Sequence, residues 1–175
     1  MNVRYLGNHL RFMFKVDGVT FKEMAASRLI IECAVLPVAA ENADEADFRH
    51  MEVAIERMHR CINDEAEYVL ADMEFHTALL AATKNRVLQG FGDILHAFFL
   101  QLQNQMISDK QAKVKSIDDH RRIQEALRIR DVVTARTIMQ EHLSVYSSFN
   151  TTGTTGTAVT TVVRGDSSQP PPRHD

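Results

Sequence analysis

Four residues with metal-binding side chains, Asp72, His76, His120 and His142, are the part of this sequence best suited to chemistry. Asp72 and His76 are four residues apart in a helical pattern, so they share one helical face. His120 and His142 are 22 residues apart, with a helix break at Arg130–Asp131 almost midway between them. A helical hairpin folded at that break returns the two imidazoles to the same height. Three imidazoles and one carboxylate converging inside a helical bundle would form a metal site.

Imidazole nitrogen and carboxylate oxygen suit a divalent transition-metal ion. We expect zinc, with nickel, manganese or iron as alternatives, because ligand type alone does not choose among them. One carboxylate and three neutral histidines leave the ion a net charge of about +1, which could attract an anionic carboxylate or hydroxy acid to its open positions. The alternative is that the histidines are hydrogen-bonded core residues, and that Asp72 and His76 form only an ion pair within their helix.

Arg28 is the second candidate binding residue. It lies just before an apolar run, where its guanidinium could clamp the carboxylate of an effector in a bidentate manner. A pair with Glu32, one helical turn further on, is an equally good interpretation. We interpret Asn85 as a turn or cap residue.

Other histidines compete for a metal role. Asp47-x-x-His50 and Glu56-x-x-His59 resemble the carboxylate-x-x-His pattern of di-iron bundles. The two pairs share one helix and fall on opposite sides of it, so one core cannot receive both; we expect them on the surface. His96 stands among apolar residues and fits a core histidine.

The composition is that of an ordinary globular chain, and its 175 residues are enough for one domain with a substantial core. The net charge of −3 argues against a chain that grips nucleic acid by itself. We find no apolar run long enough for a membrane span and no secretion signal, and we expect a cytoplasmic protein. Cys33 and Cys61 stand alone in the sequence and fit buried free thiols.

Apolar spacing predicts an all-α fold, an antiparallel bundle of six or seven helices that encloses a metal and effector pocket. Pro37 should kink the second helix. Asp44 with Asp47, Ser116 with Asp119, and Asp131 are expected helix caps. The polar stretch 108–115 is expected to be a loop. The predicted helices cover about residues 5–15, 21–42, 44–62, 65–83, 87–107, 117–129 and 132–149.

The composition changes at residue 150. The segment 150–175 is rich in Thr, Gly and Pro and is expected to be a disordered tail, since it cannot bury enough apolar surface to fold alone. The helical domain is therefore expected to span residues 1–149.

Three segments stand out in order along the chain. They are Arg28-x-x-Ile31-Glu32 with Leu36 and Ala39-Ala40, Asp72-Met73-Glu74-Phe75-His76 with Asn85, and His120-Arg121-Arg122-Ile123 with Asp131 and His142-Leu143. Together they resemble the FCD domain, the effector-binding C-terminal domain of FadR-subfamily GntR transcription regulators. The resemblance covers about residues 5–148, and Arg130 departs from it where a glycine is common.

The resemblance implies a non-enzymatic domain that senses a small organic acid through a metal ion and forms a homodimer. DNA would be bound only through a winged helix-turn-helix domain, which this chain has no room for. Two alternatives stand beside this interpretation. One is a mononuclear metallohydrolase, although Glu74, the nearby acid, is turned away from Asp72 on the helix. The other is an interaction module that forms mixed dimers with a full-length regulator.

Overall fold

The computed structural model describes residues 18–99 and 109–147, and within these ranges the chain is entirely helical. The predicted helix at 5–15 and the tail at 150–175 lie outside the described residues, so the domain boundary stays a prediction. The helices are α2 (Phe21–Asn42), α3 (Glu45–Arg60), α4 (Glu65–Ala82), α5 (Arg86–Phe99), α6 (Lys110–Arg128) and α7 (Val132–Ser147).

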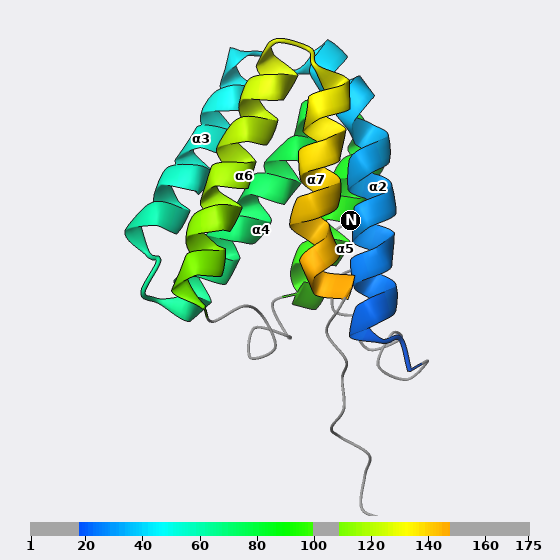
Figure 1. Ribbon diagram of the computed structural model, residues 1–175. Coiled ribbons are helices and arrows are strands. Elements are labelled where there is room, and N and C mark those ends of the chain that lie inside the picture. The colour runs from blue at the N-terminus through cyan, green and yellow to red at the C-terminus, as the bar shows by residue number, and fades with distance from the viewer. Residues whose placement is uncertain (1–17, 100–108, 148–175) are drawn as a thin grey trace, which may run out of the picture.

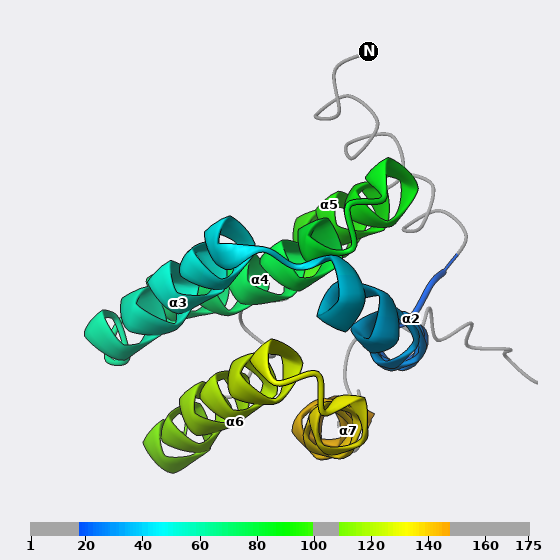
Figure 2. The ribbon, with the colours of Figure 1, turned by 90° about the horizontal axis from the view of Figure 1, so that it is seen from above.

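The helices pack in two layers, seen most clearly from above (Figure 2). The first layer holds α3, α4 and α5, in which α4 packs against both neighbours. The second holds the hairpin of α6 and α7 (Figure 1), and α2 closes the bundle by packing against α7, α4 and α6. Helices α4, α6 and α7, which carry the four candidate ligands, therefore face a common interior. The predicted all-α bundle is confirmed.

Local signals fix where several helices begin. Thr20 and Glu23 form a capping box at the start of α2, and Asp44 and Asp47 form the predicted one at the start of α3. The Asn85 side chain accepts hydrogen bonds from the backbone of Val87 (2.9 Å) and Leu88, so it is a cap residue of α5, as predicted. These caps satisfy backbone donors that a helix leaves free at its first turn.

Helix α2 continues through Pro37 and ends at Asn42. Seen from above, its last part toward α3 is turned relative to the rest, which agrees with the expected kink (Figure 2).

The prediction of a loop over residues 108–115 is wrong from Lys110 onward, and residue 108 lies outside the described residues. Helix α6 begins at Lys110, and the Asp109 carboxylate caps it by accepting from the Ala112 backbone at 3.1 Å. Lys, Gln and Ala are good helix formers, and they need no apolar stripe where the face is solvated. Ser116 and Asp119 consequently lie inside α6 and do not cap it.

The turn between α6 and α7 brings two candidate ligands together. The Asp131 backbone donates to Ala126 (2.8 Å) and Arg130 donates to Leu127 (3.0 Å), which is the Schellman pattern, with Arg130 in the left-handed region at φ 60°. Asp131 then caps α7 by accepting from the Thr134 backbone at 3.0 Å, as predicted.

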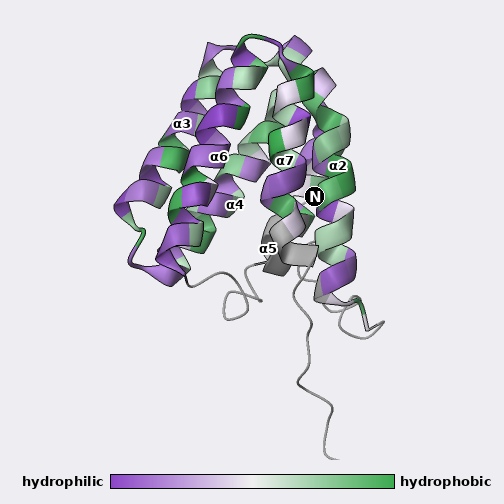
Figure 3. Cartoon of the chain, in the orientation of Figure 1, coloured by the Kyte–Doolittle hydropathy of each residue, from purple (hydrophilic) through white to green (hydrophobic). Residues whose placement is uncertain are grey.

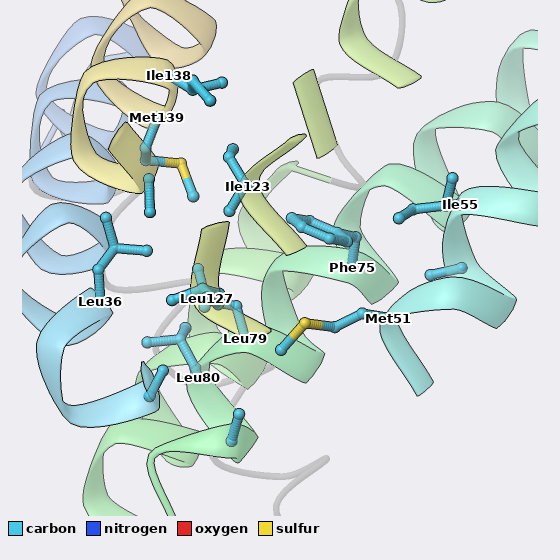
Figure 4. Packing of buried hydrophobic residues seen from close by; sticks show 14 of the residues in the cluster. Leu36, Met51, Ile55, Phe75, Leu79, Leu80, Ile123, Leu127, Ile138 and Met139 are labelled. Atoms are coloured by element: carbon cyan, nitrogen blue, oxygen red, sulfur yellow. The ribbon is translucent and has the colours of Figure 1, made fainter. Parts of the chain in front are cut away.

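The core lies between the layers. Apolar side chains from five helices meet there (Figure 4), whereas the outward faces of α3 and α6 are largely hydrophilic (Figure 3). The centre is tightly covered, since the side chains at its middle are fully or almost fully buried. They include Leu36, Met51, Phe75, Leu79, Ile123, Leu127 and Met139.

Two smaller expectations have different outcomes. Cys33 and Cys61 are free, as expected, but they are only partly buried where they pack against the core. Among the described helices, none combines the length and the apolar character that crossing a membrane requires.

Candidate metal centre

The four predicted ligands converge. Asp72 and His76 come from α4, His120 from α6 and His142 from α7, and all four side chains are buried. One potential ligand atom from each lies within 4.8 Å of the others. The i, i+4 spacing on α4 and the hairpin of α6 and α7 therefore produce the juxtaposition that the sequence predicts.

The distances within the cluster match an ion-binding arrangement. His120 Nε2 lies 3.1 Å from His76 Nε2 and 3.1 Å from His142 Nε2. Imidazole nitrogens bound to one ion at about 2.0–2.1 Å are about 2.8–3.4 Å apart for octahedral or tetrahedral angles. Since a neutral imidazole carries a single N–H, three nitrogens facing each other are better satisfied by a shared cation than by one another.

Asp72 completes the ligand set from one side. Its Oδ1 lies 3.7 Å from His120 Nε2 and its Oδ2 lies 3.9 Å from His76 Nε2. Oδ1 accepts a long hydrogen bond from Ser116 at 3.4 Å, whereas the buried Oδ2 accepts no hydrogen bond from the described residues. A buried carboxylate oxygen without a donor is costly unless cations lie near it, and Oδ2 has the Arg28 guanidinium as an ion-pair partner at 3.5 Å.

A buried ion pair orients His76. Glu32 Oε2 contacts His76 Nδ1, and Glu32 Oε1 accepts from Arg28 Nε at 2.8 Å. A carboxylate at Nδ1 fixes the proton there and leaves Nε2 free to ligate. Arg28 NH2 also lies 3.5 Å from Asp72 Oδ2, so its guanidinium bridges the two carboxylates. The pairing of Arg28 with Glu32, one of the two interpretations left open by the sequence, is present.

His142 and His120 have different neighbours at Nδ1. The Asp119 carboxylate lies 3.6 Å from His142 Nδ1 and 2.6 Å from Lys115 Nζ. His120 Nδ1 instead faces the Met58 sulfur at 3.2 Å, and the Phe75 ring stacks on His120 with centroids 4.0 Å apart. The core therefore holds His120 by packing, while carboxylates face the other two imidazoles.

The electrostatics keep the histidines available as ligands. Burial, together with the neighbouring Arg28 charge, lowers the pKa of His76. Burial and the adjacent imidazoles lower the pKa of His120 well below its usual value. Burial by itself would raise the pKa of Glu32, but His76 and Arg28 hold it at about 2. The His76 and His120 imidazoles are therefore neutral at pH 7, which is the form that binds a metal.

The other candidates lie elsewhere. His50 and His59 are exposed on α3, as expected. Glu74 pairs with Arg57 on the outside of the bundle, which leaves it away from the ligands and unsuited to a hydrolytic role. The side chain of His96 lies outside the described residues.

Five residues that contact the ligands were not recognised from the sequence as part of the site: Glu32, Met58, Phe75, Ser116 and Asp119. Glu32 was considered only as the partner of Arg28, and Asp119 only as a cap. The position of Asp119 next to His120 in the sequence is only a weak signal of a role in the site, because the packing of α7 against α6 is what brings Asp119 to His142.

The FCD domain model matches residues 23–145. The chain belongs to the FCD domain family. The match covers every residue of the cluster, so the FCD domain includes the whole candidate site.

Curated relatives of this FCD domain are transcription regulators, which supports a non-enzymatic regulatory domain. The HTH-type transcriptional regulator LutR of Bacillus subtilis (strain 168) is 26% identical over 128 residues, covering 70% of this chain and 58% of LutR. The Uxu operon regulator of Haemophilus influenzae is 25% identical over 127 residues, covering 69% of this chain and 47% of that protein. The chain thus spans about half the length of these relatives.

Solved structures share the fold. Streptococcus agalactiae GntR superposes with a TM-score of 0.60 at 19% identity, covering 73% of this chain and 58% of that one. Lar, which controls expression of the Listeria monocytogenes agr system, superposes with a TM-score of 0.63 at 16% identity, covering 73% and 61%. At these identities the likeness concerns the fold alone.

Proposed function

We propose that this chain is the metal-dependent, small-organic-acid-sensing and dimerisation domain of a GntR/FadR-type transcription regulator. The metal ligands are Asp72, His76, His120 and His142. The observation that carries the proposal is the convergence of three imidazoles on a buried carboxylate, in which His120 Nε2 lies 3.1 Å from the Nε2 atoms of both His76 and His142. Zinc is the preferred ion, since it readily accepts histidine and carboxylate ligands.

The ligand set explains why an organic acid is the proposed effector. One carboxylate leaves a divalent ion with a net charge of about +1 in a buried place, where an anion is strongly attracted. Arg28 is the proposed second contact, because its guanidinium lies 3.5 Å from Asp72 at the edge of the ligand set. Arg28 is already paired with Glu32, so it would be positioned before the acid arrives.

The regulatory step would be a population shift. The ligands come from α4, α6 and α7, so an acid bound at the ion would favour one relative arrangement of these helices. In a homodimer, that change would alter the spacing of DNA-binding domains attached to the two copies.

Metal analysis tests the proposal directly. Protein purified without chelator or nickel resin is analysed by plasma mass spectrometry, and about one ion per chain is expected. The variants His76→Ala and His142→Ala should lose it, whereas His50→Ala and His59→Ala, which remove exposed histidines, should retain it. Wild-type protein that holds no ion after reloading contradicts the proposal.

The sensing step has its own test. A panel of small carboxylic and hydroxy acids is added to metal-loaded protein, and the melting temperature is recorded. An effector should raise it in loaded protein but much less in the His76→Ala variant. If no acid changes the melting temperature of the loaded protein, the sensing role fails even where the metal site stands.

A further inference from the structure

Asp119 is a buried carboxylate in the middle of α6 that serves no helix end. It faces His142 Nδ1 at 3.6 Å, and its other ion pairs go to Lys115 at 2.6 Å and Arg122 at 3.9 Å. Both of these cations are exposed, so their pairing returns too little free energy to account for burying a carboxylate.

We propose that Asp119 is a positioning residue of the metal centre, which holds His142 in the tautomer that presents Nε2 to the ion. This inference rests on the proposed metal site. It assigns to Lys115 the smaller role of anchoring the Asp119 carboxylate in place.

The tautomer of His142 is the physical basis of the proposal. A neutral imidazole carries its proton on one nitrogen only, and a carboxylate facing Nδ1 favours the proton there. The lone pair is then on Nε2, which lies 3.1 Å from His120 Nε2 inside the cluster. Without a carboxylate at Nδ1, part of the His142 population would carry its proton on Nε2 and present it to the ion.

The Asp119 carboxylate is itself held on α6 from both directions. Lys115 is one turn before it and Arg122 about one turn after it, and their cations approach different oxygens: Lys115 contacts Oδ2 and Arg122 contacts Oδ1. Oδ2, the oxygen held by Lys115, is also the one that faces His142. Because the Lys115 side chain is 59% exposed, salt screens its charge and its effect should be modest.

Zinc affinity of the full chain, measured by competition with a chromophoric chelator, tests this role. Asp119→Asn keeps the side-chain size but removes the charge, and it should weaken zinc binding about 10–100-fold, the usual range for partners behind a metal ligand. Asp118→Asn is the matched control, since Asp118 is the adjacent carboxylate and is exposed; it should leave the affinity unchanged. The absorption bands of cobalt-loaded protein should shift in Asp119→Asn and not in Asp118→Asn. Losing a residue that only stabilises the fold would not shift these bands.

The outcomes separate this inference from the proposed function. If wild type and Asp119→Asn bind zinc equally and give the same cobalt spectrum, the positioning role is wrong while the metal centre stands. If wild type binds no zinc, both fail. If Asp119→Asn does not fold, Lys115→Gln replaces it: affinity a few-fold weaker at low salt and equal to wild type at high salt supports the anchoring, and equal affinity at both contradicts it.

Discussion

Two carboxylate–cation pairs lie behind the candidate ligands, and they differ in their surroundings. Arg28 and Glu32 on α2 are fully buried, at 0% exposure for both side chains. On α6, Asp119 is buried but its partner Lys115 is 59% exposed. The first pair is closed off from water, whereas the second connects the cluster to the surface of the molecule.

The two pairs should therefore respond differently to substitution. A buried charge whose partner is removed has no water to replace it, so the α2 pair must stay intact for the bundle to fold. An exposed cation is replaced by water and salt at little cost, so the α6 pair can change without unfolding the protein. Substitutions in the α6 pair can therefore change the surroundings of the ligands while the protein stays folded.

The largest expected loss of stability comes from breaking the α2 pair, Arg28 with Glu32. Arg28→Met leaves Glu32 and Asp72 buried without their cation, and it should lower the free energy of unfolding by about 3–5 kcal/mol. Lys115→Met should cost only about 0–1 kcal/mol, because its charge is solvated. Urea unfolding of metal-free protein, followed by circular dichroism at pH 7, measures both. Equal losses would show that the two sides do not differ as described.

The second largest effect is expected from acid, which should lower the free energy of unfolding through the buried histidines. The pKa values of His76 and His120 are lowered in the folded protein, so below pH 6.5 the unfolded chain binds more protons. The stability that the two neutral histidines contribute is fully present above pH 6.5. It is lost as the pH falls toward their lowered pKa values in the folded protein. Metal-free protein should lose about 1–2 kcal/mol between pH 7 and pH 5.5. Glu32, with its pKa at about 2, adds a separate loss only below about pH 4.5.

The exposed histidines provide the control for this pH dependence. His50 and His59 lie on the outer surface of α3, so the double variant His50→Asn/His59→Asn should show the same drop as wild type in urea unfolding at the two pH values. Stability that stays constant between pH 7 and pH 5.5 in wild type would contradict the neutral, buried state of the cluster.

The sequence predicted the elements and residues whose signals are local or periodic. The i, i+4 spacing paired Asp72 with His76, and the break at Asp131 paired His120 with His142. The resemblance to the FCD domain then favoured bringing the two pairs together, as the structure does. The predicted range 21–42 agrees with both ends of α2, although the Thr20 cap at its start was not recognised from the sequence. Such features need no knowledge of packing between helices.

The start of α6 and the neighbours of the ligands could not be predicted in the same way. Residues 110–115 are polar, so their helix shows no apolar stripe, and the Ser116–Asp119 spacing imitated a cap. Whether a carboxylate caps a helix or faces a histidine depends on tertiary contacts. Glu32 and Asp119 meet their histidines only through the packing of α2 on α4 and of α7 on α6.

The smallest expected effect concerns the turn that joins α6 to α7. Arg130 has a φ of 60°, a left-handed conformation that costs a non-glycine residue about 1–2 kcal/mol and glycine almost nothing. Glycine is also the usual residue at this position of a Schellman turn.

Arg130→Gly should therefore raise the free energy of unfolding by about 0.5–1 kcal/mol, after the greater flexibility of glycine in the unfolded chain is subtracted. Arg121→Gly, the same change at an exposed position inside α6, should lower it by about 1 kcal/mol. Urea unfolding compares the two, and a loss in both variants would mean that the Arg130 side chain contributes more than its strained backbone costs. A gain confined to Arg130→Gly would show that the left-handed backbone of this turn, and not a general effect of glycine, sets its cost.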